Sequence, residues 1–139
     1  FKDINDTYGH QVGDSALREV ASVLKGAIRP YDMCVRYAGD EFIVVLSGCG
    51  RGQAENKRVE LQEVVGRIAL EARPGDRLSL SISAGVAVFP HDGETHEALL
   101  AKADARMYSD KSARKSDTAR RVMAGVTTDT GVVAAAEPA

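Results

Sequence analysis

Two strand-like runs that flank a short acidic bend constrain the fold of this chain most strongly. Residues 34–37 and 42–46 are rich in β-branched, aromatic and apolar side chains, and the four residues between them include Gly39. Runs of this kind around a short glycine-containing segment predict a β-hairpin. The second run (FIVVL) is almost wholly apolar, which is typical of a strand buried on both faces. The hairpin is therefore expected to belong to a larger sheet.

Apolar residues recur at helical spacing on both sides of the hairpin. The spacing predicts helices over about 14–28, over about 53–72 and from about 95 onward, the first capped by Asp14 and ended before Pro30. Apolar residues and serines alternate from 78 to 83, which predicts a half-buried strand, and the small residues at 84–88 indicate close backbone packing. Residues 1–13 are predicted to form a loop, and 118–139 a poorly ordered tail or linker.

This order of elements predicts an α+β domain with a mixed sheet flanked by helices. A further strand before Phe1 would complete a ferredoxin-like β-α-β-β-α-β pattern. The 139 residues suit one domain, and the net charge of −2 argues against binding nucleic acid or an anionic membrane through bulk charge. No apolar run approaches the roughly 20 residues that span a bilayer. The two cysteines, Cys34 and Cys49, are too few for a disulfide framework or a four-ligand zinc site, and we expect reduced thiols.

Two adjacent carboxylates stand at the predicted bend. Asp40 and Glu41 follow Gly39 directly. Acidic side chains are poor strand formers and repel each other, so local propensity does not account for the pair. Paired carboxylates on a turn suit a hard cation such as Mg²⁺, which often shares its oxygen ligands with substrate phosphates. Glycine beside them would let a nucleotide approach the backbone. Taken by itself, the pair also fits a solvated turn that carries two charges.

The polar segment 1–14 offers a second group of candidate ligands. Lys2 can reach a phosphate, while Asn5 and Asp14 supply an amide and a carboxylate on either side of the predicted loop. Such a pair can read the edge of a guanine base, because the carboxylate accepts from its ring and exocyclic N–H groups. The alternative is that Asn5 forms a turn and Asp14 only caps the following helix.

Both groups, together with three downstream segments, carry a family resemblance. In chain order the segments are FKDINDTYGHQVGD at 1–14, AGDEF at 38–42, SAGVA at 83–87, FP and DG within 89–93, and a helix from Ala103-Asp104 through Met107-Tyr108 to Lys111. With these motifs in this order, residues 1–117 resemble the GGDEF-domain family of diguanylate cyclases. The resemblance implies a ferredoxin-like, nucleotidyl-cyclase-like fold.

The resemblance implies that a homodimer condenses two molecules of GTP into cyclic di-GMP and two pyrophosphates, each ribose 3′-oxygen attacking the α-phosphate held by the other protomer. Asp40 would bind Mg²⁺ or Mn²⁺ and help deprotonate the 3′-hydroxyl, with Glu41 beside it in the metal site. Lys2 would stabilise charge on the phosphates. The implied substrate-binding positions are Asn5 and Asp14 for guanine, Gly39 for close backbone approach, and Lys111 and Lys115 for phosphate.

The sequence departs from the family pattern in three places. Ala38 replaces the usual glycine, at a cost of roughly 1–2 kcal/mol if the position needs a positive φ. Arg114-Lys115 replaces the usual Gly-Arg. Lys115 keeps the positive charge at this position but lacks the planar guanidinium group of arginine, which binds phosphate through two hydrogen bonds. The family's first strand, with its D-x-D metal-binding pair, would precede Phe1. We therefore expect residues 1–117 to be a GGDEF domain lacking its first strand, with an unpaired sheet edge in its place and no activity by itself.

Arg29 and Asp32 resemble the family's inhibitory R-x-x-D site, which captures cyclic di-GMP. An arginine fork pairs with phosphate or with the Hoogsteen edge of guanine, and a nearby carboxylate accepts from guanine N–H groups; the alternative is an exposed ion pair at a helix end. The same two residues would serve a second class of function, a non-catalytic cyclic di-GMP receptor. The resemblance also implies an upstream sensory or receiver domain, no nucleic-acid partner, and a cytoplasmic domain in a parent protein that is either free or membrane-anchored.

Overall fold

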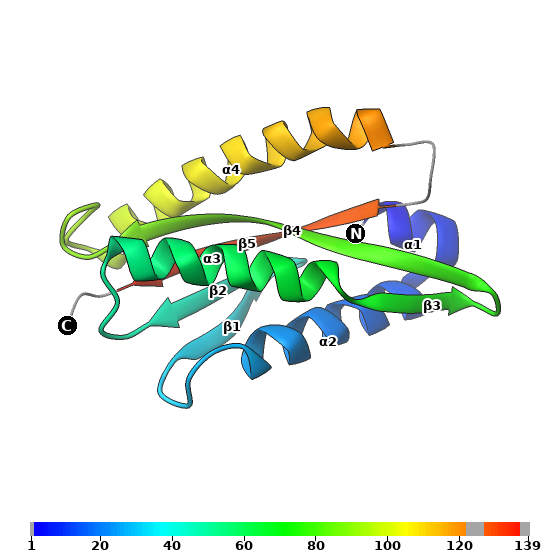
Figure 1. The fold of residues 1–139 in the computed structure, drawn as a ribbon, viewed down its shortest axis with the longest axis horizontal. Helices are drawn as coiled ribbons and strands as arrows, with labels where there is room; N and C mark the ends of the chain where they lie inside the picture. The colour runs from blue at the N-terminus through cyan, green and yellow to red at the C-terminus, as the bar shows by residue number, and fades with distance from the viewer. Residues whose placement is uncertain (1, 122–126, 137–139) are drawn as a thin grey trace.

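The chain forms a mixed α+β domain, as the order of the sequence patterns predicts (Figure 1). The computed structural model describes the backbone of residues 2–121 and 127–136 and the side chains of 4–37 and 39–113. The helices are α1 (Lys2–Tyr8), α2 (His10–Gly26), α3 (Arg51–Gly66) and α4 (His96–Arg121). The strands are β1 (Met33–Ala38), β2 (Glu41–Leu46), β3 (Ala69–Arg73), β4 (Asp76–Val88) and β5 (Thr127–Ala136).

These strands form one sheet in the order β1-β2-β5-β4-β3. The predicted hairpin is confirmed: β1 pairs antiparallel with β2, Val35 lies opposite Ile43, and the register shifts between Arg36 and Ala38. A second hairpin joins β3 and β4. β5 lies between the two hairpins and runs parallel to both β2 and β4. This direction follows from the connection, because a strand that returns through a crossover helix such as α4 runs parallel to the strand before it.

The C-terminal segment is a central strand, and the expected tail over 118–139 is wrong for most of its length. α4 continues to Arg121, and residues 127–136 form β5, while 122–126 and 137–139 lie outside the described residues. β5 pairs with β2 and β4 on its two sides, so neither of these strands has the unpaired edge that we expected. The threonines and valines of β5 favour a strand, whereas its glycine and three alanines do not, so the local preference is mixed and pairing with β2 and β4 decides the structure.

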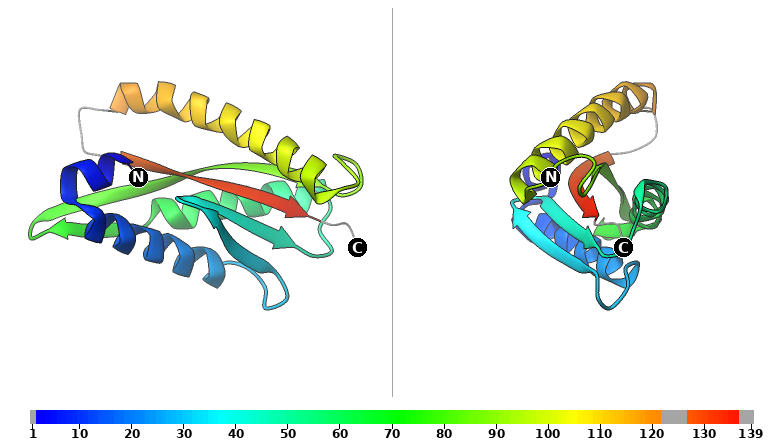
Figure 2. Two further views of the ribbon diagram at one scale, coloured as in Figure 1. Left: turned by 180° about the vertical axis from the view of Figure 1, so that it is seen from behind. Right: turned by 90° about the vertical axis from the view of Figure 1, so that its left-hand side faces the viewer.

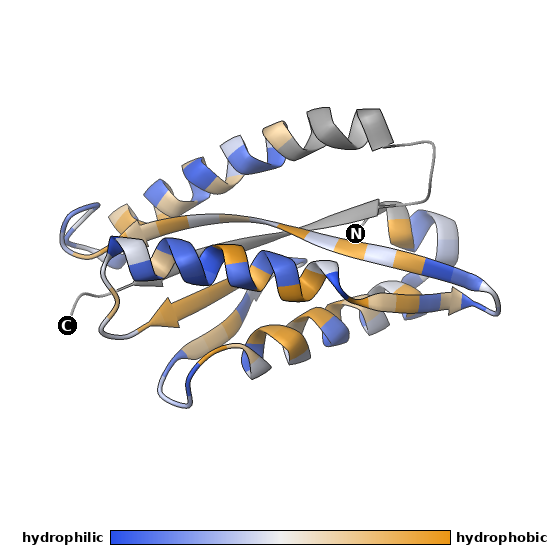
Figure 3. Cartoon of the chain, viewed as in Figure 1, coloured by the Kyte–Doolittle hydropathy of each residue, from blue (hydrophilic) through white to orange (hydrophobic). Residues whose placement is uncertain are grey.

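Helices cover both faces of the sheet, as the two views of Figure 2 show. On one face, alternate β4 residues such as Leu80 and Ile82 join Phe42 of β2 and side chains of α2 and α3 in the main core. On the other face, Leu99 and Met107 of α4 belong to a second core cluster with β4. Figure 3 shows most of β2 as apolar, in keeping with the run of apolar residues that follows Glu41, while α3 and the described part of α4 carry many polar residues. The central part of the sheet is therefore buried between two helical layers.

Gly85 marks the closest approach between the sheet and α4. A Cβ atom at this position would overlap the Ala103 carbonyl oxygen and the Met107 backbone nitrogen. The α4 backbone therefore rests directly on β4, which confirms the close packing that the small residues at 84–88 predict.

The N-terminal segment is helical, which corrects the predicted loop over 1–13. α1 is held by tertiary contacts: Ile4 is fully buried, and Arg73 donates a 3.0 Å hydrogen bond to the Thr7 carbonyl and stacks on the ring of Tyr8. Gly9, with φ +90°, separates α1 from α2. Asp14 consequently lies inside α2 rather than at its N-cap. Polar residues with two glycines give no local helix signal, and burial of one face supplies the stability.

The second predicted helix ends earlier than its apolar spacing indicates. α3 stops at Gly66, and residues 69–72, predicted to belong to the same helix, form most of β3, which pairs with β4. Gly75, with φ +86°, makes the tight connection between the two strands. Pairing with the long β4 strand thus overrides a short helical pattern.

A buried carboxylate ties the end of β4 to α4. Asp92 accepts two hydrogen bonds of 3.0 Å from Arg106 and one of 2.8 Å from the Val88 backbone N–H. The hydrogen bonds from Arg106 are the main cause that lowers the pKa of Asp92 from 3.8 to about 2, although burial acts in the opposite direction.

We expect the Asp92→Asn variant to lose stability in a pH-dependent way. Because the folded pKa of Asp92 lies below its unfolded value, its contribution is present above about pH 4 and is lost as the pH falls towards 2. A shift of this size corresponds to about 2 kcal/mol of unfolding free energy. Urea unfolding of both proteins from pH 7 to 2 measures this difference, with Asp76→Asn at the exposed first position of β4 as the control. A constant difference across this range would contradict the prediction.

Candidate functional site

The bend of the β1–β2 hairpin presents the two predicted acids. Gly39 has a φ of +47°, in the left-handed region that glycine adopts without a Cβ penalty. Arg36 Nε donates a 2.7 Å hydrogen bond to the Gly39 carbonyl and holds the bend from β1. Asp40 and Glu41 are both half-buried. Ala38 ends β1, and among the described residues only glycines have a positive φ, so the penalty considered for Ala38 does not arise.

An open cleft of about 310 Å³ lies between α2 and this hairpin. Its lining residues are Asp14, Leu17, Arg18, Ala21, Lys25, Cys34, Arg36 and Phe42. Leucine, alanine and phenylalanine side chains give it an apolar surface, and its charged side chains are three cations and a single carboxylate. Arg36 and Phe42 flank the bend in sequence, so Asp14 shares a cleft with the neighbours of the two acids. A positively charged cleft with an apolar surface suits an anionic ligand that carries an aromatic ring.

Cys34 adds a neutral side chain to this cleft. Burial raises the pKa of the Cys34 thiol, and the nearby Lys25 ammonium offsets this only in part. The thiol therefore stays protonated at neutral pH and contributes weakly polar surface rather than charge. Cys34 and Cys49 are both free.

Glu41 faces a second cleft, also of about 310 Å³, between the hairpin and α4. Its lining residues are Tyr37, Glu41, Phe42, Ile43, Leu100, Ala101 and Asp104. Phe42 lines both clefts, whereas Asp14 lines only the first. The structure therefore places Asp14 and Glu41 in two different clefts that share Phe42 as a lining residue. Asp40 precedes Glu41 at the bend and lines neither of these two clefts.

Asn5 does not line the first cleft. Its side-chain oxygen is buried without a hydrogen-bond partner and lies against Gly13, where any Cβ atom would overlap it. Gly13 directly precedes Asp14, so the two predicted guanine-reading residues come from neighbouring turns of α1 and α2. Asn5 therefore has an unsatisfied acceptor that is packed against α2 and closed to solvent.

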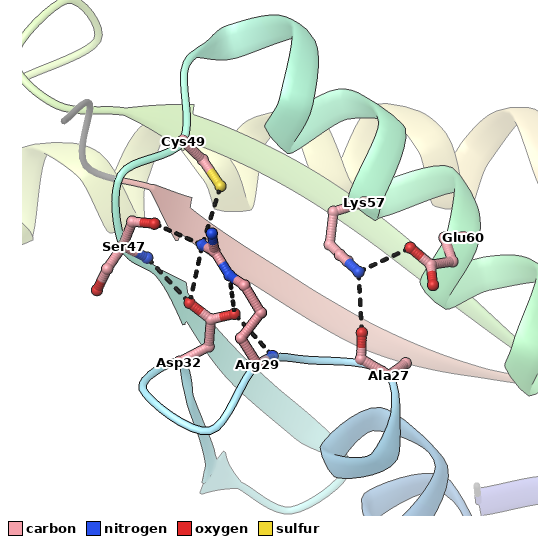
Figure 4. A network of polar contacts seen from close by, with 7 residues as sticks. All are labelled: Ala27, Arg29, Asp32, Ser47, Cys49, Lys57 and Glu60. Carbon is pink, nitrogen blue, oxygen red and sulfur yellow. Dashed lines mark hydrogen bonds and ion pairs between the residues drawn. The ribbon is translucent and has the colours of Figure 1, made fainter.

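Arg29 and Asp32 form a closed polar network with the loop after β2 (Figure 4). Asp32 is buried and accepts hydrogen bonds from Arg29 Nε at 3.0 Å and from the backbone N–H groups of Arg29 at 2.9 Å and Ser47 at 3.1 Å. Arg29 Nη2 also donates to the Ser47 carbonyl and to Cys49 Sγ. Burial alone would raise the pKa of Asp32, but these hydrogen bonds outweigh it and lower that pKa. The pair is thus an ion pair with a buried carboxylate, not the exposed pair considered from sequence.

The three predicted phosphate-binding lysines are not brought together by any described contact. Lys111 is half-buried in α4. Lys2 lies in α1 and Lys115 in α4, and their side chains are outside the described set. Their role in phosphate binding stays a prediction.

Sequence reasoning missed three cations of the first cleft: Arg18, Lys25 and Arg36. Arg18 follows Asp14 by four residues, which places both on one face of α2. This spacing could have revealed Arg18. The packing of α2 on β1, which brings Lys25 and Arg36 to the same cleft, is not readable from sequence.

Comparison with known proteins assigns the class. The sequence model described as "Diguanylate cyclase, GGDEF domain" matches residues 1–117. The chain belongs to this GGDEF-domain family.

Several curated proteins are similar to this chain. Diguanylate cyclase A of Treponema denticola is 35% identical over 111 residues, which are 80% of this chain and 30% of that protein. Response regulator PleD of Caulobacter vibrioides is 36% identical over 118 residues, 84% of this chain and 26% of that protein. Diguanylate cyclase DosC of Escherichia coli is 36% identical over 108 residues, 78% of this chain and 23% of that protein. The chain thus spans less than a third of the length of these relatives.

Within the described ranges 2–121 and 127–136, no helix combines the length and the apolar character needed to cross a bilayer.

Proposed function

We propose that the protein carrying this domain condenses two molecules of GTP into cyclic di-GMP. The cleft between α2 and the hairpin is the observation that carries the proposal, because it joins the base-reading Asp14 to the residues that flank the acidic bend. Family membership and relatives named as diguanylate cyclases support the same activity.

The first cleft has the chemistry that a guanine nucleotide requires. A purine ring can lie on the apolar surface of Leu17 and Phe42, and Asp14 can accept from its N–H groups. Asn5 is the second proposed guanine-reading residue: its side-chain oxygen is buried against Gly13 without a hydrogen-bond partner, and a rotation of this side chain towards the cleft would let it accept from a guanine N–H group. The cations of the cleft favour the negative triphosphate over a neutral nucleoside.

Asp40 and Glu41 are the residues that would hold Mg²⁺ or Mn²⁺. Among the described side chains no group of three or more metal-binding residues is found. Two carboxylates nevertheless fit Mg²⁺, which proteins often bind through one or two carboxylates plus the phosphates of the substrate. When bound, the cation neutralises phosphate charge and lowers the pKa of an oxygen that it contacts.

The remaining roles fall to residues around the bend. Asp40 accepts the proton of the ribose 3′-hydroxyl, whose oxygen forms a bond to the α-phosphorus of the second GTP while the bond to the bridging oxygen of pyrophosphate breaks. Lys2, Lys111 and Lys115 neutralise the phosphates. One cleft serves one GTP and the product contains two guanosines, so the reaction joins two copies of the domain.

Arg29 and Asp32 are proposed to capture the product and inhibit the enzyme. A cyclic dinucleotide would replace the Ser47 carbonyl and Cys49 Sγ as partners of the Arg29 guanidinium, because those contacts occupy its Nη2. The same pair would serve a receptor that binds cyclic di-GMP without consuming GTP.

We expect Asp40→Asn to abolish synthesis, lowering kcat by about 100-fold or more, because the amide neither takes a proton nor balances the cation charge. The assay follows cyclic di-GMP and pyrophosphate formed from GTP and Mg²⁺, with and without added product. Asp76→Asn, at the exposed first position of β4, is a matched control that should leave turnover unchanged. The assay uses the full-length protein that carries this domain. Unchanged turnover in its Asp40→Asn variant, or no product from the folded full-length protein, would contradict the proposal. Binding of cyclic di-GMP without GTP turnover would favour the receptor.

A further inference from the structure

Arg18 stands out among the residues of the first cleft. It lines the cleft together with Asp14, and neither side chain forms an ion pair within the described part of the chain. The other arginine of the cleft, Arg36, already donates to the Gly39 carbonyl. Arg29, Arg58 and Arg106 all pair with carboxylates. Arg18 is therefore an arginine with free donors facing the space in which the proposed base lies.

Its place on α2 matches the spacing of the two edges of a purine. Arg18 follows Asp14 by one helical turn, roughly 6 Å along the helix axis. Leu17, between them in the chain, lines the same cleft and gives the base an apolar support. A guanine base that donates its N–H groups to Asp14 therefore places the edge with O6 and N7 about one helical turn further along α2, near Arg18.

We propose that Arg18 is a specificity residue that reads the O6 and N7 atoms of guanine. An arginine fork bound to O6 and N7 is the commonest specific contact between a side chain and guanine, and its geometry is bidentate. Adenine would place an amino group against the Arg18 donors and a ring nitrogen acceptor against the Asp14 carboxylate. The pair of opposite charges one turn apart would therefore select guanine and reject adenine. This inference rests on the proposed function, since it assigns a role within the same GTP site.

Lys25 does not fit this role. It lies almost two turns beyond Arg18 and close to the Cys34 thiol, and an ammonium is a point charge without a planar fork. Its expected part is general attraction of the anionic ligand, which does not distinguish between bases.

The test is a cycle of protein and base substitutions measured by equilibrium binding. Calorimetry is carried out with the 3′-deoxy forms of GTP, 6-thio-GTP, 7-deaza-GTP, ITP and ATP, because the missing 3′-hydroxyl prevents turnover. The proteins are wild type, Arg18→Ala, Arg18→Lys and Asp14→Asn, with Arg67→Ala at an exposed position after α3 as the control. Arg18 is exposed, and circular dichroism verifies that each variant folds.

We expect Arg18→Ala to weaken the binding of 3′-deoxy-GTP by about 10-fold, the scale of a bidentate contact to a base. The same variant should weaken the binding of the 6-thio and 7-deaza nucleotides by much less, since sulfur at position 6 is a weaker acceptor than oxygen and the 7-deaza base has no acceptor at position 7. It should also narrow the preference of the protein for guanine over adenine. Arg18→Lys should recover only part of the loss. Asp14→Asn should weaken the binding of 3′-deoxy-ITP by less than the binding of 3′-deoxy-GTP, because the hypoxanthine base lacks the exocyclic amino group that Asp14 would contact.

Two results would overturn the inference. Equal weakening of all the nucleotides by Arg18→Ala would mean that Arg18 attracts phosphate rather than reads the base, and unchanged binding would mean that it does not contact the ligand. If wild-type protein binds none of these nucleotides, the proposed function itself fails. If it binds 3′-deoxy-GTP in an Asp14-dependent but Arg18-independent way, the proposed function stands and only the role of Arg18 is lost.

Discussion

Replacement of Gly85 by alanine should destabilise the folded protein by about 3 kcal/mol or more. The added Cβ atom would overlap two backbone atoms of α4, the Ala103 carbonyl oxygen and the Met107 nitrogen. Backbone atoms of a helix cannot rotate away as the end of a side chain can, so α4 would have to lift from β4 as a unit. Overpacking of a buried site typically costs 1–3 kcal/mol of unfolding free energy. Because the Cβ atom would collide with the backbone of α4, we expect a cost at or above the upper end of this range.

Chemical unfolding of wild type and Gly85→Ala measures the effect. Gly52→Ala is the matched control, because Gly52 lies in α3 with no atom near its missing Cβ, and alanine there should be neutral or stabilise by about 0.5–1 kcal/mol. An unfolding free energy of Gly85→Ala within 0.5 kcal/mol of the wild-type value would show that α4 does not pack directly on β4.

Removal of residues 122–139 should abolish cooperative folding. β5 is the only described link between the two hairpins in the sheet, since β2 and β4 pair with β5 and not with each other. Without it, β2 and β4 would both expose unpaired backbone edges, and the apolar side chains of the main core would lose the sheet that holds them together. We expect a protein that aggregates or unfolds without a sharp transition.

Far-ultraviolet circular dichroism and urea unfolding test this expectation. A chain that ends after residue 136, which keeps all of β5, is the control and should unfold like the full chain. The prediction is contradicted if the chain ending at Arg121 unfolds cooperatively with unchanged stability, because the sheet would then not depend on its central strand.

Much of the fold was predictable because local patterns and tertiary structure agree there. In the β1–β2 hairpin, in the alternating part of β4 and on the inner face of α2, the apolar residues recur with the period of the strand or helix, and these same residues are buried in the structure. The prediction failed where they disagree. α1 is stabilised by the burial of Ile4 and by Arg73 from a distant strand, β3 by pairing with β4, and β5 by two neighbours far away in the chain.

The candidate site divides in the same way. Asp14, Gly39, Asp40 and Glu41 were predicted from their types and spacing, and their roles stay predictions; the structure places Asp14 in a cleft with Arg36 and Phe42, which flank the acidic bend. Arg18, Lys25 and Arg36 were not found, since their significance depends on the packing of α2 against β1. The network of Arg29 with Ser47 and Cys49 likewise joins residues about twenty positions apart.

By itself, the order of residues determined the family, the hairpin with its acidic bend, and the chemical types available for binding a nucleotide. These properties depend on neighbouring residues and on fixed spacings, which remain the same whatever the chain packs against. Only the tertiary structure decided that the C-terminal segment is the central strand and that three cations and one carboxylate share a cleft. Strand pairing and cleft formation are contacts between distant segments, and their free energy arises only when the whole sheet and its helices assemble.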